Sequence, residues 1–317
     1  LDDLSKGKNL RFGQQARFKD NGLVPGENLA VKIWAEAVGN PLIEDALGET
    51  KVNSLFADVE TNGAGGRTAV IKYGRHLQNL EEASGLNRET GRNTPAITAA
   101  LQEQDISFGA SSSWAHEYDD RKFTPIENAQ LKSYKSTGEK FPPAIYDLTV
   151  ETDGDAGLFK TFGGEGFTDT LKNIRLVDAK ITGTGTVGGL VGKLTGKTEI
   201  DGCQVYLKNV KGGIAKEDIF TNHTRIGGTV AGGLVGSTEG NILTIRDSLA
   251  ATVIRGETAA GGLIGDGGGN LTMDHSYADC YLYSDPDTTE TDAGYAGGLI
   301  GQRVVVTATL EITDCYT

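Results

Sequence analysis

The stretch that decides the fold is Gly188-Gly189-Leu190-Val191-Gly192, because the chain repeats it almost unchanged. Three further copies stand at residues 232–236, 261–265 and 297–301, and a shortened copy, Gly157-Leu158-Phe159, precedes them. The leucines of the five copies are 32, 44, 29 and 36 residues apart. Repetition with irregular spacing indicates stacked units that share a core strand and carry loops of different lengths.

A second pattern follows each full copy: an apolar residue, a polar turn, a small residue that stands 13 to 16 residues after the leucine, and then alternation. It begins at Ile200, Ile245, Met273 and Ile312. Each unit therefore contains at least two short strands, with no helical segment between them. Units of about 30 residues built in this way predict an all-β fold, a parallel β-helix in which each coil stacks on the last.

The two adjacent apolar residues of the phrase leave one question open. In a flat strand, Leu190 and Val191 would point to opposite faces. Either both faces of this strand are covered, or the chain bends at a glycine so that both side chains enter the core. The sequence is compatible with both arrangements.

Composition and charge exclude several classes of protein. The 317 residues include 45 glycines but only 7 prolines, a balance typical of tight turns between short strands. A net charge of −13 argues against nucleic acid as a partner. No apolar run is long enough to predict membrane insertion. The chain opens at Leu1 without the features of a signal peptide, which suggests a mature region or an excised segment of a longer protein.

The cysteines fit the stack as structural residues. Cys203 and Cys315 occupy the repeat position that Ser248 and Ser276 hold in other units. Three coils at the usual strand spacing separate the two thiols by at least ~14 Å, too far for a disulfide. We expect free thiols that fill the core, and the same for Cys280 on its alternating strand.

The recurring Gly-Leu-(Val/Ile)-Gly resembles the GLUG motif, which occurs in bacterial secreted and surface-attached proteins, including adhesins and the stalks of IgA-cleaving metallopeptidases. The match covers residues 150–317, and looser likenesses extend upstream over residues 68–83, 104–114 and 123–126. The resemblance implies a right-handed β-helix at the bacterial cell surface and implies no shared catalytic residues.

Residues 1–66 contain no copy of the phrase and end in a glycine-rich linker, so we expect a small β-rich segment or partial domain there and the β-helix at 67–317. The apolar runs at 29–38 and 52–59 are the strand candidates of this segment. Residues 75–83 are the best helix candidate, with Leu77 and Leu80 on one face, and a helix at this point would cap the exposed first coil.

No catalytic constellation is recognisable. The four histidines show no His-Glu-x-x-His spacing, and His275 occupies the turn position of the repeat, where an exposed residue is expected. Neighbouring carboxylates such as Asp153 and Asp155 are weak candidates, because catalytic carboxylates must converge across a scissile bond. We therefore expect no resident cofactor. The candidate binding residues are an acidic loop that could hold Ca²⁺ weakly and a small aromatic patch: Asp285, Asp287, Glu290 and Asp292, and Trp114 with Tyr118.

Two functions are compatible with these features. The first is a non-enzymatic bacterial surface or secreted protein whose β-helix serves as a stalk or adhesin and binds a host glycan or a host or bacterial surface protein through variable loops. The alternative is a carbohydrate-active β-helix enzyme, a polysaccharide lyase or hydrolase, that uses acidic loop residues. Loss of activity on a polysaccharide after Asp285→Asn or Asp287→Asn would favour the enzyme.

Overall fold

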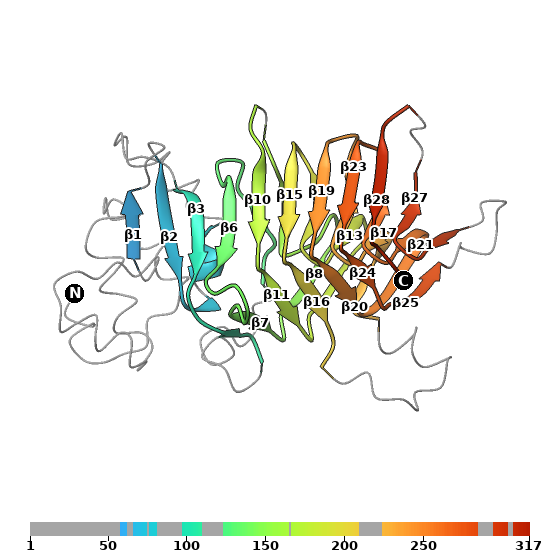
Figure 1. The fold of residues 1–317 in the computed structure, drawn as a ribbon. Helices are drawn as coiled ribbons and strands as arrows, with labels where there is room; N and C mark the ends of the chain where they lie inside the picture. Colours follow the sequence, from blue (N-terminus) through green and yellow to red (C-terminus); the bar gives the residue numbers. More distant parts are fainter. Residues whose placement is uncertain are drawn as a thin grey trace.

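The computed structural model describes residues 58–61, 66–74, 76–80, 97–109, 123–164, 166–208, 224–284, 294–303 and 307–317. Within these ranges the chain is almost entirely β, and its strands form four sheets, named here A to D. The strands of successive coils lie side by side along the stack (Figure 1). The predicted all-β class and parallel stacking are confirmed, and the right-handed winding stays a prediction.

Sheet A is the longest of the four. Its strands, in order, are β1 (Asp58–Thr61), β2 (Arg67–Ile71), β3 (Ile97–Gln102), β6 (Ser133–Ser136), β10 (Asp169–Lys172), β15 (Thr198–Asp201), β19 (Leu243–Arg246), β23 (Leu271–Asp274) and β28 (Leu310–Thr313). Sheet B contains β4 (Ile106–Ser107), β7 (Ala144–Tyr146), β11 (Arg175–Val177), β16 (Gln204–Tyr206), β20 (Leu249–Ala251) and β24 (Tyr277–Ala278).

The other two sheets complete each coil. Sheet D contains β8 (Thr149–Thr152), β12 (Lys180–Gly183), β13 (Thr186–Gly188), β17 (Ile226–Gly232), β21 (Val253–Gly261), β25 (Tyr281–Ser284) and β26 (Tyr295–Gly297). Sheet C contains β5 (Ile126–Glu127), β9 (Phe159–Phe162), β14 (Val191–Leu194), β18 (Val235–Ser237), β22 (Ile264–Asp266) and β27 (Ile300–Gln302). The chain passes through A, B, D and C in turn and returns to A one strand further along, as from β10 to β15.

Register between coils turns the sequence pattern into columns of like residues. Leu171 pairs with Ile200, which pairs with Ile245 and then with Met273, and all four side chains are buried. Side chains in such a column point to the same face and pack on one another. The core is therefore a continuous apolar column along the stack.

The glycine phrase forms the corner between sheets D and C. Gly188 ends β13 and Val191 begins β14, so the chain turns at Gly189 and Leu190. Both Leu190 and Val191 are fully buried. The question that the sequence left open is settled: the chain bends, and both side chains enter the core.

The close approach of coils explains why the corner needs glycine. A Cβ placed on Gly233 would lie 2.1 Å from the carbonyl oxygen of Gly262 in the next coil and 2.5 Å from the Cβ of Ala250. Both distances are well below the sum of the van der Waals radii of the two atoms. A side chain at this position would push two coils apart.

The cysteine predictions are confirmed in their main point. All three thiols are free. Cys203 is buried at the repeat position that Ser248 occupies in the next coil. Ser248 Oγ accepts a hydrogen bond from the Cys203 amide at 3.0 Å. Cys280 and Cys315 are partly buried and pack against the same core.

The N-terminal predictions fall partly on described residues. β1 is the described part of segment 1–66 and pairs antiparallel with β2, which makes it an edge strand of sheet A. Residues 76–80 are helical, and Leu77 and Leu80 are buried as expected. The helix is joined to the stack by reciprocal hydrogen bonds between Gln78 and the backbone of Thr124 (3.0 and 2.8 Å). The domain boundary near residue 66 and the capping role stay predictions, and residues 29–38 lie outside the described ranges.

Candidate functional site

The sequence-derived binding residues lie outside the part of the chain that the structure describes. This is the case for Asp285, Asp287, Glu290 and Asp292 in the acidic loop, and for Trp114 and Tyr118. Their role in binding, and weak Ca²⁺ binding by the loop, stay predictions. Of the candidate carboxylates, Asp155 has structural partners. Its Oδ1 accepts a hydrogen bond from the Thr186 amide at 2.8 Å, and its Oδ2 lies 3.6 Å from Lys193 Nζ.

A hollow among the described residues lies at the corner between sheets C and A. We call it the C–A groove. Its volume is about 520 Å³, and three successive coils contribute to it through the connections β9–β10, β14–β15 and β18–β19. The lining residues are Gly164, Gly166, Phe167, Thr168, Thr195, Gly196, Lys197, Gly240, Asn241 and Ile242.

Hydrogen bonds between the connections hold the groove in shape. Thr195 Oγ1 donates to the Gly163 carbonyl at 2.5 Å, and Asn241 Nδ2 donates to the Leu194 carbonyl at 3.0 Å. Each bond joins one coil to the next. The groove is therefore formed by turns that are hydrogen-bonded from coil to coil on a stacked scaffold.

The chemistry of the groove combines apolar and polar groups. Phe167 is 73% exposed and Ile242 is 42% exposed, which is unusual for large apolar side chains. Thr168, Thr195, Lys197 and Asn241 add hydroxyl, ammonium and amide groups beside them. An exposed ring next to hydrogen-bonding groups suits a ligand with one apolar face and a polar rim.

An ion pair between a buried carboxylate and a partly exposed lysine lies beside the groove. Asp169 is fully buried, and Lys132 Nζ lies 3.7 Å from its Oδ2, longer than a hydrogen bond. A Cβ on Gly164 would lie 2.3 Å from that Nζ, so the pair is directly behind a lining residue. Burial raises the pKa of Asp169 above its ordinary value, although Lys132 acts in the opposite direction. The repeat pattern does not mark this pair, because the equivalent position is Thr198 in the next coil and Leu243 in the one after.

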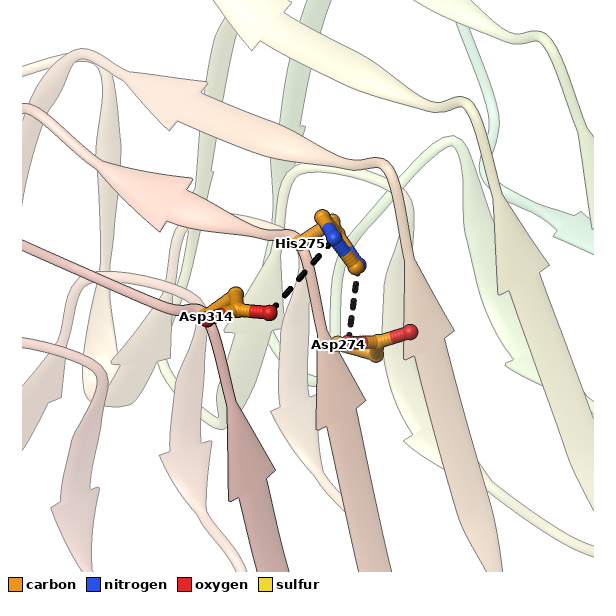
Figure 2. A group of neighbouring side chains, drawn as sticks. All are labelled: Asp274, His275 and Asp314. Atoms are coloured by element: carbon orange, nitrogen blue, oxygen red, sulfur yellow. Dashed lines mark ion pairs between the residues drawn. The ribbon is translucent and has the colours of Figure 1, made fainter.

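A second group of side chains lies at the corner between sheets A and B. Asp274 ends β23, His275 follows it, and Asp314 occupies the turn position of the next coil (Figure 2). The imidazole Nδ1 lies 2.8 Å from Asp274 Oδ1, and Nε2 lies 3.6 Å from Asp314 Oδ2. We call these three residues the corner cluster.

Backbone conformation places the cluster. His275 and Asp314 have φ of 45° and 50°, and the equivalent Asp247 one coil earlier has φ of 47°. This left-handed conformation turns the chain from sheet A to sheet B, and Asn, Asp and His adopt it more readily than other residues with a side chain. The imidazole is 60% exposed, which confirms that His275 is an exposed turn residue. Asp274 and then Asp314 and Asp247 raise its pKa above the ordinary value, because they favour the charged imidazolium.

The aromatic residues near the last coils are exposed. Tyr281 in β25 is 47% exposed, and Tyr295 in β26 is 58% exposed. Both belong to sheet D and pair with β21. They are therefore available on the surface, although they are not among the residues that line the C–A groove.

Comparisons with known proteins give little information about identity. Neither protein-family models nor curated protein sequences match the chain. The crystal structure of a putative immunoglobulin A1 protease from Bacteroides ovatus aligns over 83% of this chain and 78% of the neighbour's chain, at 14% sequence identity and a TM-score of 0.46. A likeness at that score supports no conclusion about fold or activity. Among the described residues, no helix has the length and apolar character needed to cross a membrane.

Proposed function

We propose that this chain is a non-enzymatic bacterial surface or secreted protein in which the β-helix presents a glycan-binding groove. The observation that carries the proposal is the C–A groove with its exposed Phe167 ring. The Gly-Leu-(Val/Ile)-Gly repeat supports an extracellular, adhesin-like setting through its resemblance to the GLUG motif.

The architecture suits binding rather than movement. Stacked parallel strands give a rigid scaffold, and loops at its corners can differ without disturbing the core. The groove crosses three coils, so an extended ligand can contact several of them. A chain of sugars has the required shape and chemistry.

The proposed contacts follow from the lining. A pyranose presents a face of C–H groups that can lie on the Phe167 ring, while its hydroxyls face Thr168 and Asn241. Lys197 favours a glycan that carries carboxylate or sulfate. The overall charge of −13 makes a highly anionic polymer a poorer partner than a glycan with few charges.

The test is a glycan array probed with the full chain and with two single variants. Phe167→Ala should reduce binding at least tenfold, about 1.4 kcal/mol, because the stacking surface is lost. Phe141→Ala is the matched control: this ring is 80% exposed on the β6–β7 connection, which does not contribute to the groove. Its binding should equal that of the unchanged chain.

Three other results would contradict the proposal. If the unchanged chain binds no glycan above background, the stalk role alone is left. If both phenylalanine variants lose binding equally, the contact is nonspecific. If the chain releases reducing ends or unsaturated products from a polysaccharide panel, the carbohydrate-active alternative is correct.

A further inference from the structure

We propose that Asp274, His275 and Asp314 together bind one divalent transition-metal ion, with Zn²⁺ as the best fit. This site is independent of the C–A groove, because it lies where β23 and β28 end, whereas the groove residues precede the starts of β10, β15 and β19. The one-nitrogen, two-oxygen donor set is the basis of the proposal.

Backbone pairing between coils brings the three donors together. The His275 amide donates to the Thr313 carbonyl at 3.1 Å, which fixes the turn of one coil over the turn of the next. His275 and Asp314 share the same left-handed conformation, so their side chains leave the corner in the same direction. One ligand atom from each of the three residues lies within 4.8 Å of the others.

A modest movement of the side chains would complete the coordination. Tetrahedral ligands at ~2.1 Å from zinc are roughly 3.4 Å apart, so the widest separation, which is at most 4.8 Å, must close by no more than about 1.4 Å. The side chains of His275 and Asp314 are 60% and 69% exposed and can rotate without disturbing the core. Three protein ligands would leave a fourth position for water.

A second observation supports a positive ion at this point. Oδ1 of Asp274 is inaccessible to solvent, and the structure pairs it with His275 Nδ1 at 2.8 Å. That nitrogen donates to the oxygen only when it carries a proton. When Nδ1 is unprotonated, this buried carboxylate oxygen has no donor, which is costly, and a metal ion would satisfy it.

The ligand types select the class of ion. Imidazole nitrogen is a good ligand for zinc, copper and nickel, whereas calcium and magnesium prefer sites made of oxygen alone. The corner cluster is the place in the described chain where histidine meets two carboxylates. Burial raises the pKa of Cys203 and of Cys280 to about 12, so these thiols do not compete as thiolates at neutral pH.

The experiment is isothermal titration of Zn²⁺ into the full chain without an affinity tag, at pH 7.5 and about 0.15 M salt, where the charges of exposed groups are screened beyond ~8 Å. We expect one ion per chain. His275→Asn and Asp314→Asn should each weaken binding at least tenfold, the loss expected when a ligand is removed. Asparagine tolerates the left-handed conformation, so both variants should keep their circular dichroism spectra.

Asp247→Asn is the matched control. It removes the same charge from the same column of turns, one coil away, and it leaves all three ligands in place. Its affinity should stay within about threefold of the unchanged chain, because exposed charges are largely screened at this salt. Cys315→Ser, which introduces the residue found at 248 and 276, should also leave binding unchanged.

Several results would overturn the proposal. These are the absence of zinc binding by the unchanged chain, unchanged affinity in His275→Asn, or equal losses in Asp247→Asn and Asp314→Asn. The last result would show that zinc collects on a diffuse acidic surface. Substitution with Co²⁺ provides a separate readout, because a defined site with a nitrogen ligand gives visible absorption bands that disappear in His275→Asn.

Discussion

Replacing Gly233 with alanine tests whether the repeated phrase exists to let coils approach closely. The new Cβ would lie 2.1 Å from the Gly262 carbonyl oxygen. Contacts of this kind are not found below about 3.0 Å, so the two coils must separate locally by about 0.9 Å.

That separation would affect three backbone hydrogen bonds between the coils. The donors are the amides of Gly233, Leu234 and Val235, and the donor–acceptor distances are 3.2, 2.9 and 3.0 Å. An increase of about 0.9 Å takes all three beyond the usual limit of ~3.2 Å. At a net 0.5–1.5 kcal/mol each, the loss is about 3 kcal/mol. The lower entropy of the unfolded alanine chain offsets ~0.4–1 kcal/mol of this, which leaves a net destabilisation of about 2–3 kcal/mol.

Urea unfolding followed by circular dichroism measures the change, with the midpoint and the slope both recorded because stacked repeats can unfold in steps. Hydrogen exchange of the peptide around residues 232–236 provides the local readout, and its protection should fall. Gly154→Ala is the control, because a Cβ there would meet no atom within 4 Å. Its stability should stay within about 1 kcal/mol of the unchanged chain. A loss below about 1 kcal/mol in Gly233→Ala with unchanged exchange would refute the reasoning, as would an equal loss in the control.

Three other predictions follow from the buried residues. Leu234→Ala removes a fully buried corner side chain and should cost about 2–5 kcal/mol in urea unfolding; a loss no larger than that of an exposed leucine would contradict the corner packing. Asp169 has a raised pKa in the folded state, so the folded chain holds this proton more tightly and its stability falls as pH rises from the unfolded value near 3.8 through the folded pKa. Asp169→Asn should remove that decline. The free energy of unfolding of the unchanged chain, compared with that of the variant, should therefore be lower at pH 7 than at pH 4. An identical pH profile for the two proteins would count against an ionised buried carboxylate. Because the pKa values of Cys203 and Cys280 are about 12, a thiol reagent at pH 8 should label Cys315 first in the folded chain and all three in urea, as mass spectrometry of the labelled peptides would show.

The local pattern was sufficient to predict the stack. Every coil places the same kinds of residue in the same surroundings, and these residues therefore recur. They are the glycines of the turn, an apolar residue such as Ile200 and a small residue such as Cys203. Columns in a parallel stack select like residues, and the selection is visible in one sequence. The exposed turn at His275 was predictable for the same reason.

The candidate sites were less predictable. Phe167 and Asn241 share a groove although they lie in connections of different coils, and neither belongs to the repeat. Glycines at 163, 164, 166 and 240 mark these connections in the sequence, but they do not show which connections share a corner. Asp314 meets His275 through register between coils, a relation with no fixed separation along the chain.

The sequence by itself determined the all-β class, the stacked units, the free cysteines and the core columns, because these depend on interactions that every coil repeats. Only the tertiary structure decided that the phrase is a corner where Leu190 and Val191 both turn inward, because the direction of a side chain after a glycine depends on the coil that packs against it. It also decided the groove and the corner cluster. Both are made from residues that do not recur, and only the stacking of coils brings such residues within reach of one another.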